Sequence, residues 1–175
     1  MSKKLLWVGA LGVGAIFVFA QSGSWLDGTA DQKFAKLAST QPGLGTVMVE
    51  FGNRAGNMYY AAGGSNWGLA AYQLKELTEM QEVAETTRPA RAAELKAFEQ
   101  GALAPLAKDI VNQDIGAFHK HFDVMVKRCN ACHRSSGFGF IVYAIPNRPA
   151  TPLKLNLDTK FNQADLQKML AGLLQ

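Results

Sequence analysis

The sequence has few cysteines, few histidines and few charged residues. Its 175 residues include two cysteines and three histidines, and 18% of them are charged. The cysteines are Cys129 and Cys132, and a disulfide between them would close too small a loop to stabilise a fold appreciably. Lys3 and Lys4 supply half of the formal net charge of +4, so the charge does not indicate a nucleic-acid-binding protein.

Patterns typical of common enzyme classes are missing as well. The sequence contains no phosphate-binding glycine loop, no evident pairing of a nucleophile with a base and no specific cluster of carboxylates. It also shows no internal repeat, no low-complexity segment and no strong β-hairpin signal. We therefore expect a chain of ordinary globular composition, long enough to bury a core, that is not a turnover enzyme.

The first 20 residues have the layout of a secretory signal peptide. Lys3 and Lys4 precede an apolar run at 5–20, and Val18 and Ala20 occupy the minus-three and minus-one positions of a small-residue cleavage site. The 16 residues of this run are fewer than the roughly 20 that span a bilayer.

A retained membrane anchor is the alternative interpretation of residues 1–20. If residues 21–25 are included, Trp7 and Trp25 bracket a length near the bilayer thickness, as an aromatic belt does. Both interpretations place the rest of the chain outside the cytoplasm. The expected location is the periplasm or another extracytoplasmic space, with the protein either soluble or tethered to a membrane by this segment.

Apolar residues recur at spacings of three and four in four long stretches, which predicts four helices. The first helix begins at Pro42, which suits a first turn, and ends near Gly63-Gly64. The second is capped by Ser65 or Asn66 and ends near Thr87.

The third and fourth predicted helices complete this set. The third starts around Arg88-Pro89, and Pro105 should kink or end it before a short turn at 110–111. Asp114 caps the fourth helix, which stops at Ser135-Ser136-Gly137.

These elements predict an all-α fold, with an antiparallel four-helix bundle over residues 42–137. Residues 21–41 form an N-terminal segment with a short helix at 27–39. Residues 138–175 form a wrapping tail that ends in a short helix capped by Asn162.

The sequence Cys-Asn-Ala-Cys-His at residues 129–133 is the pattern of covalent haem attachment. Helical spacing puts both cysteines on the core side of the fourth helix, near its end. In this pattern two thiols add across the two haem vinyl groups, and His133 gives a nitrogen to the iron as the proximal ligand. We therefore expect one covalent haem c, with its iron, bound through Cys129, Cys132 and His133. Thioether formation takes place outside the cytoplasm, in agreement with the N-terminal segment.

Two other uses of the cysteine pair are weaker interpretations. A thioredoxin-like redox pair requires a β-α-β context and an exposed helix N-terminus, whereas Cys129 and Cys132 lie at the end of a helix. A zinc site requires further ligands, and only His119 and His121 remain, both on the same helix.

The motif and the helix order together resemble the class II cytochromes c, the cytochrome c-prime and c-556 family. The resemblance covers residues 42–137 and implies a haem held between the helices of an antiparallel four-helix bundle. It also implies that the protein can form a homodimer, because cytochromes c-prime often pair through their helices. The family usually ends soon after the motif, whereas this chain continues for 42 residues after His133. The resemblance assigns no role to that extension.

The second axial position of the iron separates the candidate functions. His119 and His121 lie about 18–21 Å before His133 along one helix, which excludes them as ligands of the same iron. Met48 is the preferred ligand, because the start of the first helix meets the end of the fourth in an antiparallel bundle. The alternatives are that Met58 is the ligand or that the iron has no methionine ligand. Met169 could be the ligand only if the tail folded back over the haem.

Charged residues near the expected haem have two interpretations each. A basic residue of the first helix can pair with a haem propionate in cytochromes c-prime, and Arg54 is the candidate here, although a solvated arginine fits the sequence equally well. Lys127 and Arg128 flank the motif and form either a docking patch for an acidic redox partner or a solvated helix end.

Three functions follow from these observations. The first is an extracytoplasmic electron carrier that exchanges electrons with a redox partner protein through a His/Met-ligated haem. The second is a five-coordinate cytochrome c-prime-like protein that binds nitric oxide or carbon monoxide. The third is a membrane-anchored haem subunit of a respiratory or photosynthetic complex.

Overall fold

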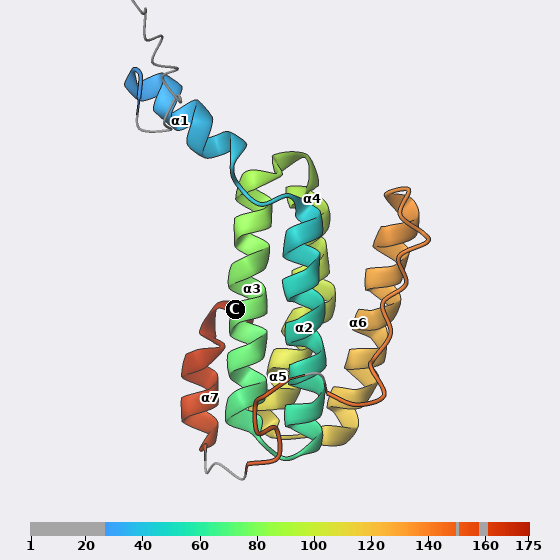
Figure 1. Ribbon diagram of the computed structural model, residues 1–175. Helices are drawn as coiled ribbons and strands as arrows, with labels where there is room; N and C mark the ends of the chain where they lie inside the picture. The colour runs from blue at the N-terminus through green and yellow to red at the C-terminus, as the bar shows by residue number, and fades with distance from the viewer. Residues whose placement is uncertain (1–26, 150, 158–160) are drawn as a thin grey trace, which may run out of the picture. The chain divides into compact units, whose positions relative to one another are not determined.

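The computed structural model describes residues 27–149, 151–157 and 161–175 (Figure 1). The predicted all-α class is confirmed, because the described residues form helices and contain no strand. The predicted leader at 1–20 lies outside the described residues. The α-helices are α1 (Ala30–Ser39), α2 (Leu44–Gly63), α3 (Trp67–Thr87), α4 (Ala92–Phe98), α5 (Ala104–Asn112), α6 (Ile115–Ser135) and α7 (Gln163–Met169).

The chain divides into two units, Met1–Ser39 and Thr40–Gln175. The first unit contains α1, which begins three residues later than the predicted start at residue 27. The second unit contains all the other helices and the candidate site. None of the helices in the described ranges combines the length and the hydropathy that a bilayer crossing requires.

The helices of the second unit pack as a helical bundle. α2 lies along α3, and α3 also contacts α4 and α5. α6 packs against α5 and α2, while α7 covers α3 and α5. The largest side chains that are completely buried come from α2, α3, α5 and its preceding turn, α6 and α7, and include Met58, Leu74, Leu77, Leu103, Leu106, Ile110, Phe118, Phe122, Met125 and Leu166.

Side chains cap the starts of three helices. The side chain of Asn66 accepts a hydrogen bond from Leu69 N at 3.2 Å at the start of α3. Asp114 accepts one from Ala117 N at 3.0 Å at the start of α6. Asn162 accepts one from Asp165 N at 2.9 Å at the start of α7, so three predicted caps are confirmed.

The prediction about Pro42 was wrong, and the prediction about Pro105 was right in part. Pro42 is not in the first turn of α2, since Gly43 is the N-cap and the helix begins at Leu44. The third predicted helix is interrupted just before Pro105, since α4 ends at Phe98 and α5 begins at Ala104, but the turn predicted at 110–111 is absent because α5 continues to Asn112. A π-helix at Glu99–Leu103 precedes Pro105, and its wider turn accommodates a ring that would otherwise meet the carbonyl four residues earlier.

The described residues between α6 and α7 form no regular structure. Gly137 has a φ of +83°, a conformation that glycine adopts without strain, and it reverses the chain direction at the end of α6. The chain then runs back beside α6 as a thin ribbon in Figure 1. Leu155 and Leu166 are buried in the core, so the later part of the extension belongs to the bundle.

Candidate functional site

The end of α6 brings Cys129, Cys132 and His133 together at helical spacings of three and four. Both cysteines are free thiols and half-buried. Cys129 packs against the hydrophobic core, and Cys132 Sγ lies 4.0 Å from Ser136 Oγ. Two thiols and an imidazole on adjacent turns form a donor set that fits covalent haem attachment.

His133 is held by a backbone carbonyl of the returning chain. Its Nδ1 lies 2.8 Å from the carbonyl oxygen of Ile141. A carbonyl oxygen only accepts hydrogen bonds, so Nδ1 carries the hydrogen in this contact. In the neutral ring Nε2 then has the free lone pair, which is the arrangement found in most metal-ligating histidines.

Asn130 joins α6 to the same returning chain through two hydrogen bonds. Its Nδ2 donates to the carbonyl oxygen of Tyr143 at 2.9 Å, and Tyr143 N donates to its Oδ1 at 2.8 Å. The side-chain amide therefore pairs with one residue of extended chain as a neighbouring strand would. This pairing lies one helical turn before His133.

The returning chain also contacts α2. The hydroxyl of Tyr143 donates to the carbonyl oxygen of Gly52 at 3.3 Å, and the hydroxyl of Tyr60 donates to the carbonyl oxygen of Pro146. A Cβ atom at Gly56 would lie 3.7 Å from the ring of Pro146, which is ordinary van der Waals contact. The segment thus links the end of α6 to the middle of α2.

The surroundings of this site are apolar enough to disfavour charge. Burial raises the pKa of the Cys129 thiol to about 12, and the neighbouring Cys132 adds to this effect. Burial also raises the pKa of Tyr143 to about 12, with a smaller contribution from Cys129. A redox-active cysteine needs a lowered pKa, so the environment of Cys129 disfavours the thioredoxin-like interpretation.

The candidate methionine ligands lie in different surroundings. Met48 is half-buried near the start of α2 and packs against the core. Met58 is completely buried in the same helix, and Met169 packs against the core from α7. The assignment of one of them to the iron stays a prediction.

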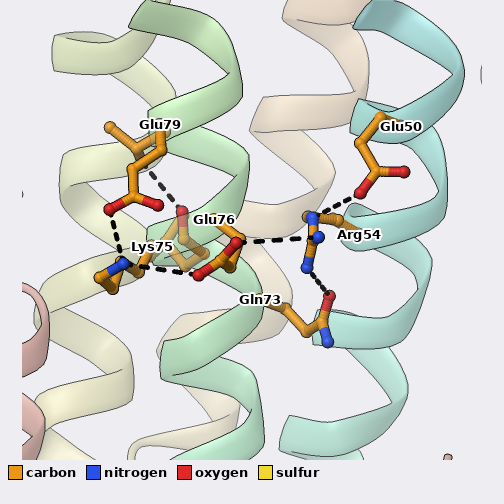
Figure 2. Close-up of polar contacts among 8 residues, drawn as sticks. Glu50, Arg54, Gln73, Lys75, Glu76 and Glu79 are labelled. Carbon is orange, nitrogen blue, oxygen red and sulfur yellow. Dashed lines mark hydrogen bonds and ion pairs between the residues drawn. The ribbon is translucent and has the colours of Figure 1, made fainter.

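Arg54 has carboxylate partners on α2 and α3, as Figure 2 shows. Its Nε lies 2.7 Å from Glu50 Oε1, and its Nη2 lies 3.8 Å from Glu76 Oε2. Its Nη1 donates to Gln73 Oε1 at 3.3 Å. The contacts of Arg54 are therefore made between α2 and α3, and its pairing with a haem propionate stays a prediction.

The other two histidines lie toward the start of α6. His121 Nδ1 is 2.6 Å from Asp109 Oδ2, and burial raises the pKa of Asp109 although the contact with His121 opposes that shift. The ring of His119 lies 5.3 Å from that of Tyr59. Within the described ranges, no group of three or more His, Cys, Asp or Glu side chains could hold a metal ion.

Sequence reasoning missed the residues that organise the site around His133. Asn130 lies inside the motif at a position that the attachment pattern leaves open, and Ile141 contributes only a backbone carbonyl, which has no residue signature. Gly52 and Gly56 were the one available signal, because two glycines four residues apart on a helix mark a close approach of another chain segment.

No family model, curated protein or solved structure matches this chain.

Proposed function

We propose that the protein is an extracytoplasmic c-type cytochrome that carries one covalent haem and transfers electrons. The observation that carries this proposal is the hydrogen bond from His133 Nδ1 to the Ile141 carbonyl at 2.8 Å. It leaves Nε2 as the metal-binding nitrogen, directly after two free thiols at the spacing that haem attachment requires.

Each residue of the motif has a distinct role in this proposal. Cys129 and Cys132 form the thioether bonds, and His133 supplies the proximal nitrogen. Haem iron supplies the one-electron redox change when it is bound. The chain fixes the orientation of the imidazole and surrounds Cys129 with apolar groups that exclude water.

The proposed architecture is an antiparallel four-helix bundle of the class II cytochrome c type. α2, α3, the α4–α5 stretch and α6 are the four helices, and the motif ends the last of them. The extension after Gly137 is a departure from that family, and the contacts of this extension with His133 and Asn130 support a role at the haem.

Met48 is the proposed second axial ligand. Tyr143 bonds both Asn130 on α6 and Gly52 on α2, which sets these two positions at the same level. If α2 and α6 run in opposite directions, His133 lies about 4.5 Å and Met48 about 6 Å further toward the same end of the bundle. Met58 lies about 9 Å from Gly52 in the other direction along α2.

Electron transfer requires a partner protein rather than a substrate. Exposed basic side chains at Lys127, Arg128 and Arg134 surround the motif and favour an acidic partner surface. Residues 1–20 would export the chain and be removed, or remain as a tether to the membrane.

Absorption spectra of the protein from a host that matures c-type haem test this proposal. We expect covalently bound haem, a weak far-red sulfur-to-iron band in the ferric state and no reaction of the ferrous state with carbon monoxide. A high-spin spectrum with ready carbon monoxide binding would instead assign a gas-binding function. Absence of covalent haem would refute the proposal as a whole.

Replacement of the methionine identifies the ligand. Met48→Ala should abolish the far-red band, whereas the control Met80→Ala, which removes a half-buried methionine from α3, should retain it. Survival of the band in Met48→Ala would move the assignment to Met58.

A further inference from the structure

The segment 138–146, which we call the strap, is bound at both ends. Phe138 N donates to the carbonyl oxygen of His133 at 2.7 Å, just after the turn at Gly137. At the other end the Tyr60 hydroxyl donates to the carbonyl oxygen of Pro146. Between these ends, Ile141 and Tyr143 are bonded to side chains of α6.

Hydrophobic burial holds only part of the strap. Tyr143 and Ile145 pack against the core, whereas Phe140 is 81% exposed and Val142 is 70% exposed. The conformation of the exposed part around Ile141 therefore depends on hydrogen bonds, and Asn130 makes two of them. The side chain of Tyr143 also bonds the backbone of α2.

The bonds of Asn130 determine where the Ile141 carbonyl points. In an extended chain the carbonyls of residues two apart face the same side. Ile141 and Tyr143 are two apart, and both carbonyls accept hydrogen bonds from α6 side chains. Pairing of Asn130 with Tyr143 therefore turns the Ile141 carbonyl toward His133.

We infer that Asn130 is a positioning residue for the proximal histidine and that the strap is part of the haem site. This inference rests on the proposed function. The hydrogen bond from Nδ1 to the carbonyl oxygen of Ile141 makes the imidazole of His133 a stronger electron donor to the iron. A stronger donor favours the ferric state and lowers the reduction potential. Loss of the Asn130 bonds lets the strap move, and the donor strength of His133 falls.

The full-length haem protein provides the first test. In Asn130→Ala we expect a higher midpoint potential than in the unsubstituted protein and, with Met48→Ala added to both so that the ferrous iron is five-coordinate, a lower iron–histidine stretching frequency. Tyr143→Phe, which loses the bond to Gly52, should shift both quantities in the same direction by less. The control Asn112→Ala removes an amide that accepts from Gln163 Nε2 at 3.1 Å on another part of the bundle, and it should shift neither.

The same variants without haem provide a second, independent test. Nuclear magnetic resonance of the haem-free chain should show His133 with its hydrogen on Nδ1, and Asn130→Ala should move the tautomer population toward Nε2–H. Amide exchange of Tyr143 should become roughly tenfold faster, because its hydrogen-bond acceptor is lost.

The outcomes separate this inference from the proposed function. If every variant attaches haem and Asn130→Ala leaves both the potential and the tautomer unchanged, Asn130 is not a positioning residue, and the cytochrome proposal stands. If no protein attaches haem, the cytochrome proposal fails, and the haem-free tautomer decides whether the strap orients His133. If Asn130→Ala does not fold, Tyr143→Phe tests whether the strap orients His133. An unchanged potential and an unchanged His133 tautomer in Tyr143→Phe would overturn the inference.

Discussion

The two halves of α6 are stabilised by different interactions. In the first half Phe118, Phe122 and Met125 are buried in the core among α2, α3 and α5. In the second half no residue of 126–135 is fully buried, and hydrogen bonds to the strap take the place of core packing. One helix thus combines a part that stabilises the bundle with a part that is bonded to the strap, and in the proposed cytochrome the second part carries the haem.

Under the proposed function, this difference accounts for the position of the motif at the end of the helix. A haem attached in the first half would have to displace three large side chains from a close-packed interior. In the second half it would meet a strap held partly by polar contacts, which could adjust without loss of core volume.

Phe122→Ala should have the largest effect on stability, because it removes a completely buried ring from the first half. We expect the free energy of unfolding to fall by about 3–5 kcal/mol in a denaturant titration. Val124→Ala is the matched control, since Val124 is 40% exposed on the same helix. Equal effects of the two substitutions would mean that the burial of Phe122 does not stabilise the bundle.

Alkylation of Cys129 tests how far the second half is shielded from water. With the pKa raised to about 12, the thiol persists through pH 9 and ionises only as the pH approaches that value. In the haem-free Cys132→Ser chain at pH 9, iodoacetamide should therefore react roughly 10²–10³-fold more slowly than in the urea-unfolded chain. The same shift makes the folded chain lose stability as the pH rises from about 9 toward 12. Equal rates in the folded and unfolded chains would mean that the second half is open to solvent.

Tyr60→Phe should produce the smallest change, because it removes one hydrogen bond between α2 and the strap. We expect a loss of about 0.5–1.5 kcal/mol in the free energy of unfolding. Tyr72→Phe, which alters a 44% exposed tyrosine of α3, should be nearly neutral. A loss as large as that of Phe122→Ala would show that the strap stabilises the bundle as strongly as the core does.

The helices could be predicted because the signals that define them are local. Asn66, Asp114 and Asn162 each cap a helix through a side chain that bonds a backbone N–H three residues later. Phe51, Ala55 and Met58 follow the apolar spacing of α2 at steps of three and four, and all are buried. Spacing alone was enough for these assignments.

The strap and the π-helix could not be predicted because they depend on tertiary contacts. A carbonyl such as that of Ile141 belongs to every residue type, so nothing in the sequence marks it as the acceptor for His133. The structure around Pro105 was predicted only in part for a related reason. Its ring is tolerated because the π-helix widens the preceding turn, while Leu106 and Ile110 remain buried in the core.

The turn at Gly137 has a consequence for chain length. His133 and its acceptor Ile141 are eight residues apart, and the chain between them is closed by that turn. Insertion or deletion of one residue would move the acceptor by about 3.3 Å and face its carbonyl away from the helix. Surface loops commonly tolerate changes of length, but this one is expected to tolerate none. The number of residues between His133 and Ile141 is therefore as much a part of the site as the identity of its side chains.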